Sequence, residues 1–287
     1  MARKLKIVLI SLAIVILLFV AAGWVGSGLW NKGTARAITE LHQAMTPGRA
    51  KAFTDQELAG LPAPVARYLK MALREGQPYI RSARIIQEGA LRLRQTEQRW
   101  SPFTAQQEFT APPAGFVWDA SVRMLPILSA RIRDSYLPGR ASMRGRLFGL
   151  IPVVNASGTP ELSQGGLQRY LSEMVWFPTA FLPGQGVEWS AIDDRRALAT
   201  ITDSGTSVSL EFRFNERDEV AEVFATGRWR VIEGKYILTP WGGRHFNYEE
   251  RQGVRVPTEF VVIWHLPDGD FDWMKARLTE VSFGFEP

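Results

Sequence analysis

Hydrophobic and polar residues alternate with a period of two over most of the chain after residue 80. The alternation is clear at residues 90–94, 129–133 and 142–144, and it is most regular at residues 206–214. Such alternation is typical of strands with one buried face. Clusters of Asp, Asn, Ser and Gly separate the strand-like segments at hairpin spacing. The pattern predicts about ten or eleven antiparallel strands, a number that suits a strongly curved, unclosed barrel-like sheet, and we expect a single domain over residues 80–287.

One segment within this region has the period of a helix. Its apolar residues follow the i, i+3, i+4 spacing of one buried helical face: Leu167, Tyr170, Leu171, Met174 and Val175. Thr159 and Pro160 are typical of a helix N-terminus, and Pro178 stops the helix. The pair Gly165–Gly166 weakens the first turn. We therefore expect a central helix at residues 159–178, firm from 167 to 176 and packed on the curved sheet, which gives an α+β fold.

The first 79 residues predict helices of two kinds. Residues 7–25 are apolar apart from Ser11 and Gly23, which at about 1.5 Å per residue spans most of a ~30 Å hydrocarbon layer. This pattern predicts a membrane anchor at residues 1–30. A cleaved signal peptide is the alternative, because small residues stand at 20–22, but the apolar run is longer than such a peptide usually has. Residues 31–79 predict short helices, the best of them at 62–74.

Charge and composition set the expected location. Arg3, Lys4 and Lys6 precede the apolar run, so the positive-inside rule places the N-terminus in the cytoplasm and the domain outside. The net charge of +5 falls to +2 without these three residues, which argues against a nucleic-acid partner. The absence of cysteine excludes a disulfide framework and an acylated cysteine. We expect a single-pass protein of the inner membrane with an extracytoplasmic domain.

Motifs of catalysis and cofactor binding are missing from the sequence. There is no G-x-S-x-G elbow, Walker A loop or dinucleotide fingerprint, and none of the three histidines has a ligand partner at a recognised metal spacing. We therefore predict no catalytic residue, no metal and no cofactor. If the protein were an enzyme, the acid–base groups to mutate first would be Asp119, Asp134, Glu173 and His265.

Arginines occur in four Arg-x-Arg pairs, at residues 92/94, 131/133, 144/146 and 228/230. In a strand both members of a pair lie on the same face. If the strands are neighbours, the sheet has an arginine-lined face that suits the phosphate or carboxylate groups of lipid headgroups or wall polymers. The alternative is an ordinary solvated outer face.

Aromatic residues near the end of the central helix leave two interpretations open. Trp176 lies on the side of the helix opposite Leu167, so this end is apolar all round. It is either enclosed by the sheet or borders a ligand cavity. The predicted ligand-binding residues are Trp118, Trp176 and Phe177 as the cavity lining and Arg131, Arg133 and Arg144 at its rim. The leading hypothesis is non-enzymatic binding of a lipid or other amphiphile. The alternative is a structural envelope module that binds an anionic polymer through its arginine face.

Five short motifs carry a resemblance. They are LPAPVARYL (61–69), PFTA (102–105), GFVWDA (115–120), WFPTA (176–180) and WHLPDG (264–269). Together they resemble an uncharacterised bacterial family of domains of unknown function, over about residues 58–285. This resemblance implies one domain and a bacterial source, and it implies no activity. The expected architecture is also loosely similar to periplasmic lipoprotein carriers, whose unclosed barrels hold acyl chains, an analogy of fold that does not establish function.

Overall fold

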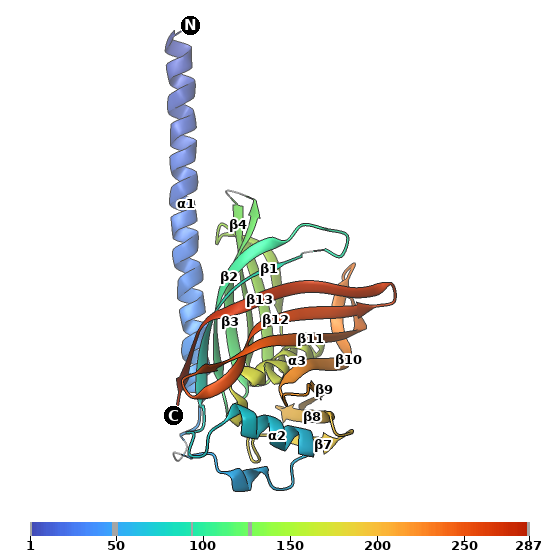
Figure 1. The fold of residues 1–287 in the computed structure, drawn as a ribbon. Coiled ribbons are helices and arrows are strands. Elements are labelled where there is room, and N and C mark those ends of the chain that lie inside the picture. Colours follow the sequence, from blue (N-terminus) through green and yellow to red (C-terminus); the bar gives the residue numbers. More distant parts are fainter. Residues whose placement is uncertain (1, 48–50, 93, 126–127, 286–287) are drawn as a thin grey trace.

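The computed structural model describes residues 2–47, 51–92, 94–125 and 128–285, which form a long helix, a strongly curved sheet and a second helix on the inner face of the sheet (Figure 1). The helices are α1 (Ala2–Gln43), α2 (Ala63–Ala72) and α3 (Pro160–Glu173), with short 3-10 turns at Asp55–Leu58, Met174–Trp176 and Pro178–Phe181. The strands of the first half are β1 (Ser82–Leu91), β2 (Ser101–Thr110), β3 (Gly115–Leu125), β4 (Leu128–Leu137), β5 (Arg140–Leu147) and β6 (Ile151–Ser157). Those of the second half are β7 (Val187–Ala191), β8 (Arg196–Asp203), β9 (Thr206–Phe214), β10 (Val220–Ile232), β11 (Lys235–Arg251), β12 (Val254–Leu266) and β13 (Gly269–Gly284).

In the described part of the chain, all thirteen strands belong to one antiparallel sheet with the order β6-β5-β4-β3-β2-β1-β13-β12-β11-β10-β9-β8-β7. The sheet consists of two meanders, β1–β6 and β7–β13, which join where β1 pairs with β13. The two edge strands, β6 and β7, follow one another in the sequence, and α3 is part of the connection between them. The prediction of a curved antiparallel sheet packed on a helix is confirmed, with more strands than the sequence predicts.

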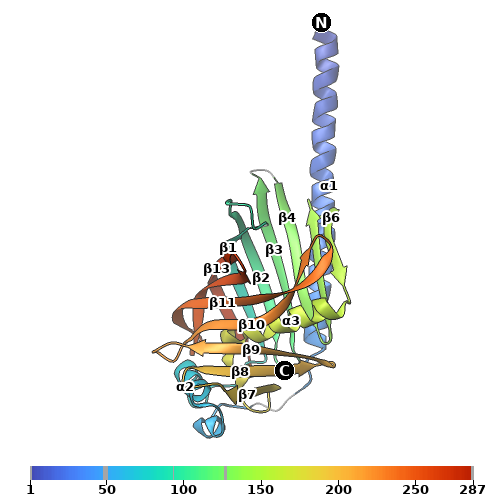
Figure 2. The same cartoon turned by 90° about the vertical axis from the view of Figure 1, so that its right-hand side faces the viewer.

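Helix α3 lies on the concave face of the sheet, where it contacts β4, β5, β8, β9 and β10 (Figure 2). The side chains of the predicted apolar stripe, from Leu167 to Val175, are all buried. The side chain of Thr159 caps the helix by accepting a hydrogen bond of 3.2 Å from the Leu162 N–H. A Cβ at Gly166 would lie 2.9 Å from Cδ2 of Tyr136 on β4. This glycine therefore allows the close approach of α3 to the sheet, a benefit that offsets its low helix propensity.

The C-terminal part of helix α1 packs on the convex face, against β2, β3 and β4, while its N-terminal half extends away from the domain (Figures 1 and 2). The helix runs unbroken to Gln43, so the residues after 30 continue it where the sequence predicts separate short helices. Among the described residues, no helix combines the length and the mean hydropathy needed to cross a membrane, and the predicted transmembrane anchor is not supported.

Candidate functional site

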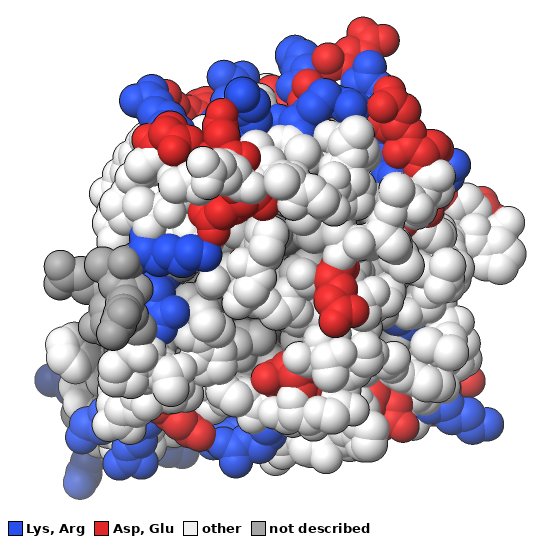
Figure 3. All heavy atoms as spheres, turned by 90° about the horizontal axis from the view of Figure 1, so that it is seen from below, with Lys and Arg blue, Asp and Glu red and all other residues white. Residues whose placement is uncertain are grey.

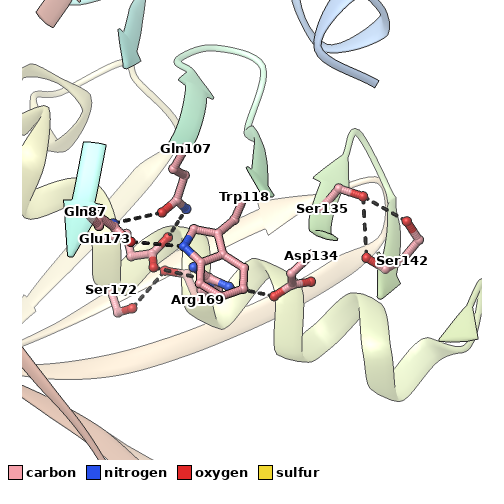
Figure 4. A network of polar contacts seen from close by, with 9 residues as sticks. All are labelled: Gln87, Gln107, Trp118, Asp134, Ser135, Ser142, Arg169, Ser172 and Glu173. Carbon is pink, nitrogen blue, oxygen red and sulfur yellow. Dashed lines mark hydrogen bonds and ion pairs between the residues drawn. The ribbon is translucent and has the colours of Figure 1, made fainter. Parts of the chain in front are cut away.

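A polar network lies on the concave face of the sheet, between β1–β4 and α3 (Figure 4). The indole N–H of Trp118 donates to Gln87, whose amide donates to Gln107 (3.0 and 3.2 Å). Gln107 in turn donates to Oε2 of Glu173 at 2.7 Å. Gln87 and Gln107 are fully buried, and Trp118 is nearly so. The network therefore satisfies the polar groups of three adjacent strands inside the core, where an unpaired amide would be costly.

Arg169 of α3 is the centre of the charged part of this network. Its Nη1 donates to Oδ2 of Asp134 on β4 at 2.7 Å, and its Nε donates to Oε1 of Glu173 at 2.9 Å. The guanidinium carbon also lies 4.9 Å from the ring centre of Phe116 and 5.1 Å from that of Trp118. One cation thus holds two buried carboxylates, and α3 is fixed to β4 through side chains as well as through apolar packing.

Burial shifts the acid–base behaviour of this cluster. Burial raises the pKa of the Glu173 carboxyl, although Arg169 and Gln107 stabilise its charged form. Burial lowers the pKa of Arg169, but the carboxylates of Glu173 and Asp134 outweigh this effect and leave it raised. Arg169 therefore stays a cation, while burial favours the protonated form of Glu173.

A second arginine enters the same region from β10. Arg228 packs its guanidinium carbon 4.4 Å from the ring centre of Trp241 and lies against α3 at Gly165. Its Nη1 is buried and has no hydrogen-bond partner among the described residues. Burial lowers the pKa of Arg228 to about 10, an effect opposed by the nearby carboxylate of Asp134. The concave face thus holds one arginine that is paired with two carboxylates and one that has no ion-pair partner among the described residues.

Apolar side chains continue along the concave face beyond α3. Met124 alternates with Trp118 along β3, and Ile132 of β4 pairs with Ala120, so both share the face of the polar network. On β12, Phe260 contacts Trp176, and Trp264 has the same parity as Phe260. Met124, Ile132 and Trp264 pack on the core but are only partly buried. These three side chains are apolar and partly accessible on the concave face, and we call them the concave apolar surface.

The structure places the three predicted aromatic residues inside the packed core. Trp176 and Phe177 are each 1% exposed and contact Phe109 with ring centres 6.1 and 4.9 Å apart. Trp118 belongs to the polar network. The last turn of the helical segment is therefore enclosed by the sheet. Of the two interpretations that the sequence leaves open for this end, solid packing describes Trp176 and Phe177.

The predicted arginines lie on the opposite face of the sheet. Arg133 pairs with Arg144 across β4 and β5, and Arg131 pairs with Arg146, so these two Arg-x-Arg pairs do form a cluster. The cluster is on the convex face, whereas Trp118 faces α3. The predicted arginines and aromatic residues therefore cannot contact one ligand together.

Helix α1 occupies part of this arginine cluster. Trp30 donates from its indole N–H to both carboxylate oxygens of Asp119, at 2.9 and 3.1 Å, and Arg131 pairs with Asp119 at 2.9 Å. Arg133 donates to the Thr34 hydroxyl at 2.8 Å. Burial lowers the pKa of Arg133, and the neighbouring arginines lower it further. The contacts use two of the predicted arginines to hold α1, while Arg144 remains exposed.

A pocket of about 310 Å³ lies beside these contacts, lined by Asn31, Thr34, Asp119 and Arg131 among others. It is on the convex side and does not reach α3. The four acid–base residues named from the sequence are dispersed. Asp134 and Glu173 share Arg169, Asp119 is on the convex face, and His265 pairs with Asp270 at 2.7 Å. No group of three potential metal ligands occurs among the described residues.

Comparison with known proteins places the chain in a family. Residues 59–283 match the family of unknown function DUF6920. The chain belongs to this family. The resemblance inferred from its motifs is thereby confirmed. No curated protein matches the sequence.

Solved structures with similar folds include a LolA superfamily protein from Nitrosomonas europaea, with 12% identity, a TM-score of 0.37, and coverage of 82% of this chain and 96% of that one. Another is a β-barrel-like protein of the domain of unknown function DUF1849 from Brucella abortus, with 10% identity, a TM-score of 0.22, and coverage of 72% and 99%.

Sequence reasoning missed the buried amides and Arg228. Gln87 follows Ile85 at strand parity, and Gln107 stands between Ala105 and Phe109 on the same parity. A polar residue at an apolar position of a strand is a signal of a buried polar group, and this signal was available. In the sequence Arg228 stands out only as a member of an Arg-x-Arg pair, and its position on the concave face depends on how the strands around β10 pair in the sheet.

Proposed function

We propose that this protein binds a lipid or another amphiphile, without catalysis, on the concave face of its curved sheet. The observation that carries the proposal is the concave apolar surface of Met124, Ile132 and Trp264, which is continuous with the core yet only partly buried. Apolar side chains left accessible on a concave face are typical of ligand sites. An acyl chain that covers them would complete the burial that α3 leaves unfinished.

We also propose the location that the sequence predicts, the inner membrane, with the N-terminus in the cytoplasm and the domain outside. Helix α1 exposes many large apolar side chains along its N-terminal half, among them Leu12, Leu17, Leu18 and Trp24. The β5–β6 hairpin points in the same direction as this half of α1 (Figures 1 and 2) and exposes Ile151, Val153 and Val154. Exposed apolar side chains that share one end of a protein are typical of a membrane-facing surface.

The alternative function, binding of an anionic polymer through an arginine face, is less favoured. Arg131 and Arg133 are engaged by Asp119 and α1, which leaves Arg144 and Arg146 of the convex cluster. The end of the molecule opposite the N-terminus of α1 shows acidic and basic side chains interspersed around a largely uncharged centre (Figure 3). A polyanion is held by an extended positive potential, which two remaining arginines and an end of mixed charge do not favour.

Photo-crosslinking tests the proposal. The full-length chain in phosphatidylcholine nanodiscs is incubated with a fatty acid that carries a diazirine on its chain, irradiated and digested, and the labelled peptides are identified by mass spectrometry. We expect label on the strands that carry Met124, Ile132 and Trp264. Ile132→Glu should remove this label, whereas Ile192→Glu, a change at an exposed isoleucine of the β7–β8 hairpin, should leave it. Label confined to α1 in the wild-type chain would refute binding on the concave face.

A further inference from the structure

Two arginines of β10 present their guanidinium groups on the concave face, stacked on tryptophans of the neighbouring strands. Arg228 packs on Trp241 of β11 at 4.4 Å, and Arg230 packs on Trp264 of β12 at 5.6 Å, measured from the guanidinium carbon to the ring centre. Trp241 and Trp264 are directly paired between β11 and β12. The two guanidinium groups therefore lie over two adjacent indole rings. One of these rings, that of Trp264, belongs to the concave apolar surface.

Stacking occupies the faces of these guanidinium groups and leaves their N–H edges unused. Within the described chain, neither Arg228 nor Arg230 forms a hydrogen bond or an ion pair, and Nη1 of Arg228 is buried. Arg213 shows the contrast. It stacks on Phe224 at 5.3 Å and also pairs with Glu211 and Glu222 at 2.7 and 2.9 Å. A buried N–H without an acceptor is costly, and a stacked guanidinium keeps the planar edge that binds an oxyanion through two parallel hydrogen bonds.

The charge of the surrounding groups also favours an anion at this place. Asp134 and Glu173 share Arg169, so these three groups leave one negative charge, against two positive charges on Arg228 and Arg230. Both carboxylates face Arg169 at hydrogen-bonding distance and are not within ion-pair distance of Arg228. These five groups therefore carry a net charge of +1, and the two cations without an ion-pair partner are both on β10.

We propose that Arg228 and Arg230 form the binding site for the acidic headgroup, a carboxylate or phosphate oxyanion, of the amphiphile whose chain lies on the concave apolar surface. This inference rests on the proposed function and specifies its ligand as an anionic amphiphile. Trp264 belongs to both the headgroup site and the chain site. Its indole stacks on Arg230, and it is one of the apolar side chains that contact the chain of the ligand.

Competition against the diazirine fatty acid tests this site. The full-length chain in phosphatidylcholine nanodiscs is labelled in the presence of oleate, of oleyl alcohol, or of inorganic phosphate. Oleate should compete at least tenfold better than oleyl alcohol, which has the same chain without the charge, because charge-assisted hydrogen bonds distinguish the two ligands. Inorganic phosphate alone should compete only at much higher concentration. Equal competition by phosphate and oleate would show a site for a free anion and overturn the proposal.

Substitutions test whether Arg228 and Arg230 cause the preference for oleate over oleyl alcohol. Arg228→Met and Arg230→Met keep an apolar contact with the tryptophans and should reduce competition by oleate about tenfold while leaving oleyl alcohol unchanged, and Arg230→Lys should restore part of the difference. Arg213→Met, which removes a stacked but paired arginine, is the matched control, and thermal unfolding checks that each variant is folded. Equal competition by oleate and oleyl alcohol in the wild-type chain would overturn the headgroup site but leave the proposed function standing. Absence of specific concave-face label would refute both.

Discussion

Replacement of Arg169 by methionine should be among the most destabilising single changes in the domain. Among the described residues, Arg169 is the only ion-pair partner of Asp134 and of Glu173, at 2.7 and 2.9 Å, and the three side chains are only 9–15% exposed. Removal of one partner of a buried ion pair typically costs about 3–5 kcal/mol, because the other charge stays buried without compensation. Two carboxylates lose their partner here. Protonation of Glu173, whose pKa burial already raises, limits the loss, so we expect a decrease of about 3–5 kcal/mol in the free energy of unfolding.

Urea unfolding of the full-length chain in mild detergent, followed by tryptophan fluorescence, measures this decrease. The control is Arg244→Met, which removes an ion pair of similar length with Asp270 in which both side chains are more than 40% exposed, and which should cost less than about 1 kcal/mol. Neutralising all three buried groups together, with Arg169→Met, Asp134→Asn and Glu173→Gln, should recover part of the loss. If Arg169→Met costs no more than Arg244→Met, the network is not a buried charged cluster.

Three further changes test other parts of the structure. Gly166→Ala should lower the free energy of unfolding by about 1–3 kcal/mol through overpacking. Gly165→Ala should be neutral or stabilising, because the nearest described atom is 3.7 Å from the new Cβ. Equal thermal unfolding temperatures of the two variants would contradict this difference. Burial lowers the pKa of His245 to about 4, below its unfolded value, so the unfolded state binds more protons and stability should fall as the pH decreases from about 6.5 to 4. His245→Leu should flatten that part of a stability–pH curve, and an unchanged slope would refute this role of His245. Trp30→Ala removes the donor to Asp119 and should speed amide hydrogen exchange in residues 26–41 of α1 but not in α3; unchanged exchange in α1 would show that other contacts hold the helix.

Local hydrophobic patterns were sufficient to predict the helix and strands that bury one face. The α3 stripe from Leu167 to Val175 and the alternation of β9 both reflect one buried face, and each can be recognised without knowing what covers it. The glycine pair shows the limit of this reasoning. Propensity alone treats Gly166 as a weakness, because the close approach of Tyr136 from β4 is a tertiary contact.

The candidate site could be predicted less well for the same reason. The sequence allows the pairing of Arg133 with Arg144, but Arg133 is held by Trp30 and Thr34 of α1, which stand 103 and 99 residues earlier in the sequence. Similarly, Arg169 and Glu173 stand four residues apart on one helix, a spacing at which side chains meet, but nothing in the sequence points to Asp134 as the third member. Sites made from strands and helices distant in sequence depend on register, and periodicity fixes the face of a residue but not its neighbour.

The pairing of β1 with β13 has a consequence for the synthesis of the protein. Ser82 pairs with Gly284, so a strand made early must wait for one made about 200 residues later. Although β13 is the last strand in sequence, it occupies the middle of the sheet order. Loss of the 16 residues of β13 would therefore divide the sheet into two halves with new unpaired edges, whereas loss of the edge strand β6 would only make the sheet one strand narrower. A nascent chain remains in this divided state until β13 has been made, and this dependence on distant contacts predicts slow folding and a need for protection from aggregation before the sheet is complete.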